Sequence, residues 1–116
     1  MEFPEILSID YVKYLTYCPI IYDAYKLIMG TNKIIDETKF SFFKRNKKIL
    51  PSQSIEYFQE RINENLSHTG ESSYLRIAET IGQIKEINET LAQELITDIR
   101  TNYKRRTKLM SILNRF

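Results

Sequence analysis

The C-terminal part of the chain carries the pattern that decides the fold: residues 72–116, SSYLRIAETIGQIKEINETLAQELITDIRTNYKRRTKLMSILNRF. Apolar side chains recur in it at steps of three, four or seven residues, which places them on one face of a helix. They are Ile77, Ile81, Ile84, Leu91, Leu95, Ile99, Tyr103, Met110 and Leu113. No proline interrupts the pattern, so it predicts a C-terminal helix of about 43 residues, roughly 65 Å long. Such a helix either projects into a partner or bends, near Gly82 or near Asn88.

A shorter helix is predicted just before this one. Residues 51–54, Pro-Ser-Gln-Ser, have the composition of a helix start. Ile55, Phe58, Ile62 and Leu66 follow at helical spacing, and residues 67–70, Ser-His-Thr-Gly, form a break. We therefore expect residues 51–116 to be helical apart from this break.

The N-terminal part is rich in aromatic residues. Residues 8–29 repeat Tyr, Ile and Leu mostly at steps of three or four, which predicts a helix within residues 1–30 that Pro19 kinks or splits and Gly30 ends. Residues 33–50 differ, because short aromatic or β-branched runs such as residues 40–43, FSFF, lead into basic residues. These runs predict a short β-hairpin or an irregular loop.

The expected fold is mainly α, with about four helices in a single domain that covers residues 1–116. Its parts are an aromatic-rich helix at residues 1–30, a loop or hairpin at residues 33–50 and a helical region at residues 51–116. A chain of 116 residues buries roughly two thirds of its unfolded surface, which is enough for one core without a metal or a disulfide.

The composition leaves few residues for catalysis or metal binding. One Cys, one His and 3 Gly are too few for a zinc site of the Cys/His kind or a glycine-rich phosphate loop. The acids are spread singly, with no pair set up for acid–base catalysis. We therefore expect a protein that is not an enzyme and that uses no cofactor or metal. The single cysteine and the lack of an apolar run of about 20 residues favour an intracellular location, cytoplasmic or nucleoid-associated.

Two clusters of basic residues are the clearest candidates for a functional surface. The first consists of Lys44, Arg45, Lys47 and Lys48, and the second of Arg100, Lys104, Arg105, Arg106 and Lys108. On a continuous helix, Arg100, Lys104 and Lys108 would form one stripe. Such a stripe can bind the phosphates of nucleic acid or dock an acidic partner subunit, and it is also typical of a solvated helix end. The charge pattern leaves these three interpretations open.

The order of features in residues 49–116 is that of a known family. Ile49-Leu50-Pro51 leads into an amphipathic helix with Tyr57-Phe58, and a loop and a further helix follow. The last helix ends in residues 94–110, ELITDIRTNYKRRTKLM. This order resembles the α-helical A domain of GINS replication subunits, in which a helix with Leu-Pro and aromatic residues precedes a long helix that closes with an Arg/Lys-rich stretch. The β-rich B domain of many members has no counterpart here other than residues 33–50.

The resemblance implies a non-catalytic subunit of a DNA replication complex, which assembles through long helices and bridges the MCM helicase to a RecJ-like partner. The predicted partner-helix interface is the apolar face of the long helix, in which an asparagine can set the register. It consists of Ile77, Ile81, Ile84, Asn88, Leu91, Leu95 and Ile99. The expected partners are other subunits of a homo- or hetero-oligomeric complex, with DNA as a further candidate, and neither a membrane nor a small-molecule substrate.

A second resemblance covers only residues 8–25 and rests on residues 14–22, YLTYCPIIY. They are similar to the N-terminal Tyr-x-x-Cys-Pro motif of the CRISPR-associated RecB-like nucleases. In that family the cysteine binds an iron–sulfur cluster together with three C-terminal cysteines. This chain has Cys18 only and no recognisable nuclease residues, so no cluster is expected. The alternative function is therefore a small helical nucleic-acid-binding protein of viral or defence origin.

Overall fold

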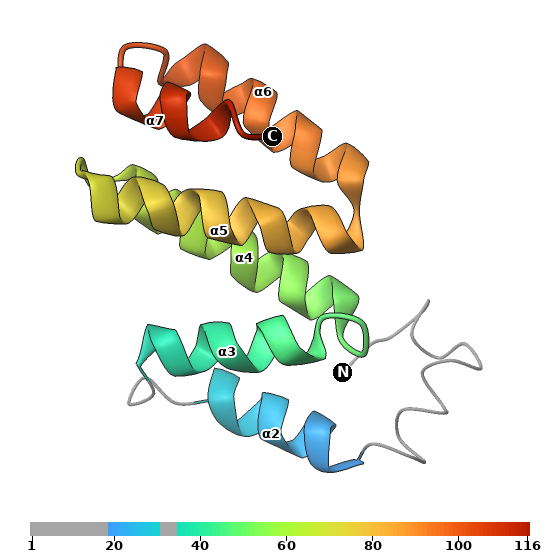
Figure 1. Cartoon of the computed structure of the whole chain (residues 1–116). Helices are drawn as coiled ribbons and strands as arrows, with labels where there is room; N and C mark the ends of the chain where they lie inside the picture. Colours follow the sequence, from blue (N-terminus) through green and yellow to red (C-terminus); the bar gives the residue numbers. More distant parts are fainter. Residues whose placement is uncertain (1–18, 31–34) are drawn as a thin grey trace. The chain divides into compact units, whose positions relative to one another are not determined.

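A computed structural model describes residues 19–30 and 35–116 (Figure 1). The chain divides into two compact units, Met1–Ile49 and Leu50–Phe116. In the described part of the first unit lie helices α2 (Pro19–Met29) and α3 (Asp36–Asn46). The second unit, which we call the four-helix unit, contains α4 (Pro51–Leu66), α5 (Glu71–Ile87), α6 (Glu89–Asn102) and α7 (Thr107–Leu113).

The prediction of a mainly α fold is confirmed, but its details differ. Six helices lie in the described residues, rather than about four, and no strand occurs among them. The part of the predicted N-terminal helix before Pro19 lies outside the described residues, while α2 ends at Met29, directly before Gly30 as expected.

The predicted hairpin or loop at residues 33–50 is wrong, because residues 36–46 form helix α3. Its buried aromatic residues, Phe40 and Phe43, are three positions apart and therefore share one helix face. Acidic residues occupy the first turn and basic residues the last turn, which is the arrangement that the helix dipole favours. The Phe43 ring meets Tyr25 of α2 edge to face, with 6.1 Å between ring centroids, and so joins the two helices.

Helix α4 begins at Pro51, as predicted. Proline suits the first position of a helix because the N–H it lacks would have no partner there. The apolar face of α4 buries Tyr57, Phe58, Ile62 and Leu66. The predicted break at residues 67–70 is present, and Gly70 adopts a φ of 141°, which glycine tolerates and other residues do not.

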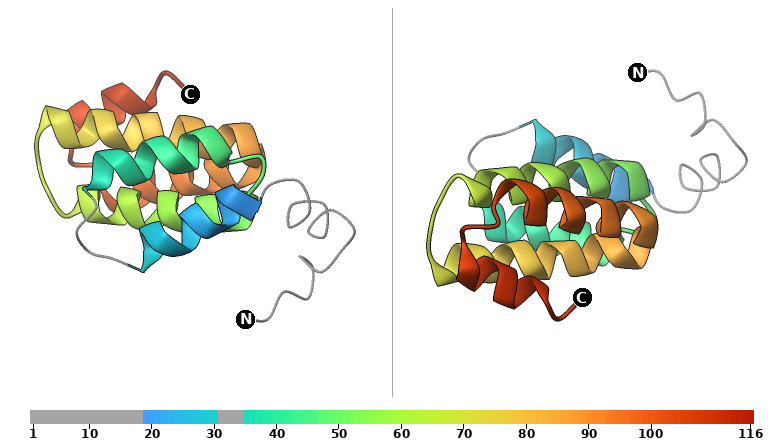
Figure 2. Two further views of the ribbon diagram at one scale, coloured as in Figure 1. Left: turned by 90° about the horizontal axis from the view of Figure 1, so that it is seen from below. Right: turned by 90° about the horizontal axis from the view of Figure 1, so that it is seen from above.

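Helix α5 is the centre of the four-helix unit and packs against α4, α6 and α7. Figures 1 and 2 show α4 and α5 side by side, with α6 and α7 on one face of this pair. Three isoleucines of α5 at helical spacing, Ile77, Ile81 and Ile84, are completely buried. The neighbouring helices add Ala92, Ile96, Ile99, Leu109, Ile112 and Leu113 to this core.

The predicted long helix at residues 72–116 is divided into α5, α6 and α7. The first break lies at Asn88, one of the two predicted positions, while Gly82 stays inside α5. Asn88 has an extended backbone, and its Oδ1 accepts a hydrogen bond from Leu91 N at 3.1 Å. Asparagine is favoured at this position because its side chain satisfies an N–H that the helix start leaves unpaired. The second break, at residues 103–106, is not indicated by the apolar pattern.

A buried arginine joins α4 to α5. Arg61 is 3% exposed, and its Nε donates a hydrogen bond to Thr80 Oγ1 at 3.0 Å. The Thr80 hydroxyl in turn donates to Arg76 O at 2.7 Å, and Arg61 Nη2 lies 3.7 Å from Glu79 Oε1. Because a buried charge is stable only with polar partners, these contacts fix the position of α4 along α5.

Candidate partner-docking site

The second basic cluster does not form the predicted stripe along one helix. Arg100 lies on α6, which ends at Asn102, and Lys108 lies on α7, which begins at Thr107. Residues 103–106, here called the basic loop, connect the two helices. The i, i+4 spacing of the basic residues therefore does not place them on a common face.

Three of these basic side chains have partners inside the four-helix unit. Arg100 Nη2 donates to Asn114 Oδ1 at 3.0 Å. Lys108 Nζ lies 2.5 Å from Glu71 Oε2, and its hydrogen bond and charge hold the pKa of the Glu71 carboxyl below the usual range. These two residues therefore fix α7 to its neighbours.

Arg106 holds the basic loop itself. Its Nη1 donates to Leu66 O at 2.7 Å and lies 3.4 Å from His68 O, at the connection between α4 and α5. Its guanidinium also lies over the Tyr103 ring, 4.6 Å from the centroid. One arginine thus joins the two connections at the same end of the unit.

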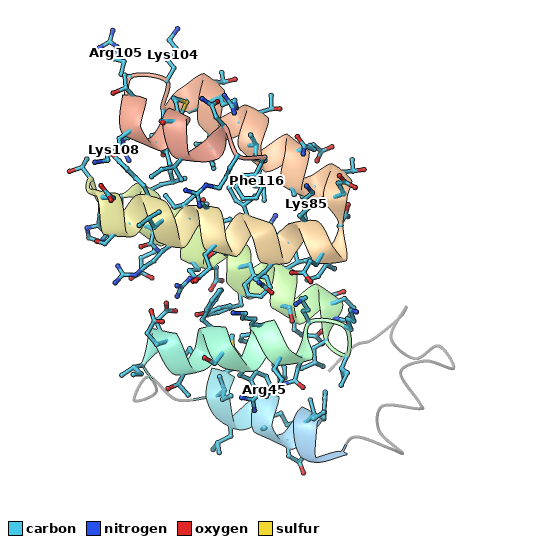
Figure 3. The ribbon with its side chains drawn as sticks, viewed as in Figure 1. Arg45, Lys85, Lys104, Arg105, Lys108 and Phe116 are labelled. Carbon is cyan, nitrogen blue, oxygen red and sulfur yellow. The ribbon has the colours of Figure 1, made fainter. Side chains whose placement is uncertain are left out.

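Lys104 and Arg105 are the exposed cations of the basic loop. Figure 3 shows both side chains extending from the loop away from the helices. Neither forms a hydrogen bond or an ion pair with any residue that the structure describes. Because Arg106 and Tyr103 fix the loop on either side, the two cations are presented from an ordered backbone.

A cleft of about 240 Å³ lies between α4 and α6, and we call it the α4–α6 cleft. Its lining combines apolar and polar surface in similar proportion, the polar part including Asp98 and two asparagines: Ile62, Asn63, Leu66, Leu95, Asp98, Ile99, Asn102 and Tyr103. A shallow hollow of about 360 Å³ follows at the basic loop and is lined by residues 101–106. Both are lined by Asn102 and Tyr103, so the cleft and the hollow adjoin at these two residues.

The residues of the predicted partner-helix interface do not lie together on one open face. Four of them belong to the core of this chain: Ile77, Ile81, Ile84 and Ile99. Asn88 is exposed and caps α6. Leu91 and Leu95 are half-buried, and Leu95 lines the α4–α6 cleft. Of the predicted interface, these two leucines are therefore the apolar positions that a partner can reach.

The first basic cluster lies in the other unit, at the end of α3 and the turn that follows. Lys44 Nζ lies 6.0 Å from the centroid of the Phe40 ring, and Lys47 Nζ donates to Lys44 O at 3.3 Å. Lys48 also has a partner within the structure, while Arg45 is exposed and labelled in Figure 3. Only part of this cluster is therefore available to another molecule.

Sequence reasoning missed the α4–α6 cleft and the role of Arg106. The cleft depends on how two helices separated by α5 pack, and no local pattern reports that arrangement. Arg106 binds carbonyl groups 38 and 40 positions earlier in the chain, so its structural role has no signal in the neighbouring sequence. Arg61 had a signal, because it falls on the apolar face of α4 between Phe58 and Ile62.

No group of three or more His, Cys, Asp and Glu side chains among the described residues is arranged to hold a metal ion. Within the same part of the chain, no helix has the length and apolarity needed to cross a membrane. Comparisons of the chain with protein-family models, with curated proteins and with solved structures found no match.

Proposed function

We propose that this chain is a non-catalytic subunit of a macromolecular assembly that docks another protein at the α4–α6 cleft. The observation that carries this proposal is the open cleft itself, in which the half-buried Leu95 lies beside Ile62 and Leu66. An accessible cleft that combines apolar side chains with groups able to form hydrogen bonds is the kind of surface that binds a partner's side chain. The chemistry available in the described residues supports binding better than catalysis.

The resemblance to GINS subunits supplies the more specific form of the proposal, a scaffold in a DNA replication complex. The order of elements in the four-helix unit is compatible with it. Leu50 precedes and Pro51 begins a helix with buried aromatic residues, and the basic loop follows α6. The mode of assembly that we propose is different from the one the sequence predicts, because the isoleucines of α5 are occupied in the core and only Leu91 and Leu95 remain accessible.

The test is purification of the tagged full chain from the cells that produce it, at about 0.15 M and about 0.5 M salt, with identification of stoichiometric partners by mass spectrometry. A replication scaffold is expected to retain MCM helicase subunits and a RecJ-like protein at both salt concentrations, because apolar contacts are not screened. Recovery of the chain without any replication protein in comparable amount would contradict this function.

A second candidate function, nucleic-acid binding, is favoured by one observation: Lys104 and Arg105 are exposed on an ordered loop. Two phosphate contacts correspond to a slope of about −2 in a plot of log K against log salt, whereas the five or six contacts of an intact basic stripe would give about −5. Fluorescence anisotropy of labelled single- and double-stranded oligonucleotides over a salt series measures this slope. If the double variant Lys104→Ala/Arg105→Ala binds as the unmodified chain does, this candidate is excluded.

A further inference from the structure

We propose that the α4–α6 cleft and the basic loop form one docking site for a protein segment in which an apolar side chain is followed by carboxylates. The inference rests on the proposed function and deepens it by naming the chemistry of the partner. It is argued from the lining of the cleft, from the continuity of its two halves and from the charges at each position.

The apolar half of the site is already built by the fold. Ile62, Leu66 and Ile99 line the cleft and are each less than 10% exposed, so their positions are fixed by the core behind them. Leu95 is half-buried and therefore offers apolar surface that a partner can cover. The cleft of about 240 Å³ has room for one aliphatic or aromatic anchor against these apolar side chains, the contact that dominates many small interfaces.

The charged half lies directly next to it. Asn102 and Tyr103 belong to the lining of both the cleft and the hollow at the basic loop. A chain that places an apolar side chain in the cleft therefore brings its following residues to Lys104 and Arg105. Because these cations have no acidic partner in the described residues, a carboxylate of the bound segment meets them without displacing an existing ion pair.

The loop is also fixed before binding. Arg106 ties it to Leu66 O, and the Tyr103 ring packs under the same guanidinium. A binding surface that is ordered in the free protein loses little conformational entropy when a partner arrives. Because the loop is already ordered, Lys104 and Arg105 can contribute to the affinity for the bound segment and can orient it, although they are only two cations.

A polypeptide fits this site better than a nucleic acid. Asp98 lines the cleft, and its carboxylate repels the charged backbone of a nucleic acid running through it, whereas the proposed segment places an uncharged side chain there and its carboxylates at Lys104 and Arg105. The residues Leu50–Phe116 contain nine acidic and nine basic residues, so the four-helix unit has no excess positive charge to attract a polyanion. By contrast, the amides of Asn63 and Asn102 can hydrogen-bond to the backbone of a bound peptide.

The test uses the full chain and a phage-displayed library of random peptides about 12 residues long. We expect the selected peptides to share an aliphatic or aromatic residue followed by Asp or Glu. A selected peptide, labelled with a fluorophore, should lose at least about tenfold in affinity when its carboxylates are replaced by lysine.

Variants of the chain then locate the binding site. Leu95→Lys should weaken peptide binding by about 30-fold or more, and Lys104→Ala/Arg105→Ala by about 3- to 10-fold, mainly through slower association. The controls are Leu75→Lys, an exposed leucine on α5 that does not line the cleft, and Lys85→Ala, near the far end of α5 from the basic loop (Figure 3). Both should bind as the unmodified chain does. The exposed positions 104 and 105 keep the test valid if Leu95→Lys impairs folding.

Three outcomes overturn the inference. One is the absence of enriched peptides, or enrichment of peptides without carboxylates. Another is binding that neither Leu95→Lys nor the loop double variant weakens. The third is displacement of the peptide by a single-stranded oligonucleotide of about 20 nucleotides whose own binding depends on Lys104 and Arg105. Peptide binding as expected without replication partners in cells would leave the inference standing and remove the replication role. Recovery of replication partners together with any of the three outcomes above would do the reverse.

Discussion

Helix α5 and the basic loop differ in the kind of interaction that keeps each of them in place. Helix α5 is surrounded by α4, α6 and α7, and its residues Ile77, Ile81 and Ile84 are excluded from water. The basic loop is half-exposed, and it is held by an arginine that reaches two backbone carbonyls and a tyrosine ring. The difference separates the part of the unit that gives stability, through burial, from the part that gives a defined surface, through a few polar contacts.

The largest effect is expected in the core. Ile81→Ala should lower the free energy of unfolding by about 2–5 kcal/mol, because it removes a fully buried side chain and leaves a cavity. Urea denaturation followed by circular dichroism measures the change. Leu75→Ala, at a leucine that is 42% exposed, is the matched control and should change stability by about 0.5 kcal/mol or less. Equal losses in the two variants would show that α5 is not the centre of the core.

Substitutions of the buried Arg61 test whether its packing or its polar contacts contribute more to the stability of the α4–α5 contact. Arg61→Ala should destabilise the unit by about 2–3 kcal/mol, since it removes both a hydrogen bond to Thr80 and the packing of a long side chain. Arg61→Met keeps most of that packing without a charge to desolvate, so it should recover most of the loss. Equal destabilisation by the two substitutions in chemical denaturation would assign the effect to the lost polar contacts instead.

Removing the arginine of the basic loop should affect the loop more than the core. Arg106→Ala is expected to cost about 1–2 kcal/mol of global stability, because it removes a charged hydrogen bond to Leu66 O. Hydrogen exchange of residues 103–106 should accelerate far more than exchange in α5. Arg106→Lys should restore little, because lysine lacks the planar group that lies over Tyr103. If hydrogen exchange accelerated equally throughout the four-helix unit, the basic loop would not be held separately from the core, and the contrast between α5 and the loop would be wrong.

Loss of the helix cap at Asn88 should lower the free energy of unfolding by a smaller amount. Asn88→Ala should cost about 1 kcal/mol, since it removes the side chain that accepts from Leu91 N, while Asn88→Asp and Asn88→Ser should be nearly neutral. Thermal unfolding of the three variants and of the unmodified chain gives the comparison. If Asn88→Ala were as stable as the unmodified chain, the cap would not be the reason why α5 and α6 are separate helices.

The smallest effect belongs to the exposed ion pair between Lys108 and Glu71. The pKa of Glu71 is lowered in the folded chain, so the pair adds stability above the carboxyl's ordinary pKa, and this contribution is lost as the pH falls through the lowered value. Carboxyl chemical shifts in an NMR pH titration should therefore place Glu71 below 4.5, its usual value, and Lys108→Ala should return it toward that value. An unchanged titration in Lys108→Ala would mean that the contact is not formed in solution.

The periodic pattern identified the apolar helix face of α5, because burial on a helix face repeats locally, and the composition placed the start of α4 at Pro51 and the break at residues 67–70. The pattern did not show what covers that face: we predicted Ile77, Ile81 and Ile84 as a partner interface, and they lie in the core of this chain. Residues 36–46 were misassigned, because a run of aromatic residues is compatible with two structures. It has high strand propensity, and it also places Phe40 and Phe43, three positions apart, on one helix face.

The candidate site was less predictable from the same pattern. The apolar step from Ile99 to Tyr103 continues the helical spacing across a point where α6 has already ended. After α6 ends, the chain forms the basic loop instead of a further helical turn. This loop is held by hydrogen bonds from Arg106 to Leu66 O and His68 O, which lie 40 and 38 positions earlier in the chain. The assignment of Asn88 to a partner interface had a similar cause, because its position in the apolar series does not distinguish a buried asparagine from a helix cap.

The bond between Arg106 and Leu66 O has a thermodynamic consequence. Leu66 has two structural roles: it lines the cleft, and its carbonyl oxygen accepts the hydrogen bond from Arg106 that holds the basic loop. A ligand that binds the cleft only when the α4 terminus is in this position also favours the state in which the Arg106 bond is closed. By linkage, the factor by which the ligand favours the closed bond over the open one is also the factor by which opening the bond lowers the affinity of the cleft for that ligand. This holds even though Arg106 does not line the cleft. The two connections at this end of the unit then respond to binding as a single coupled element.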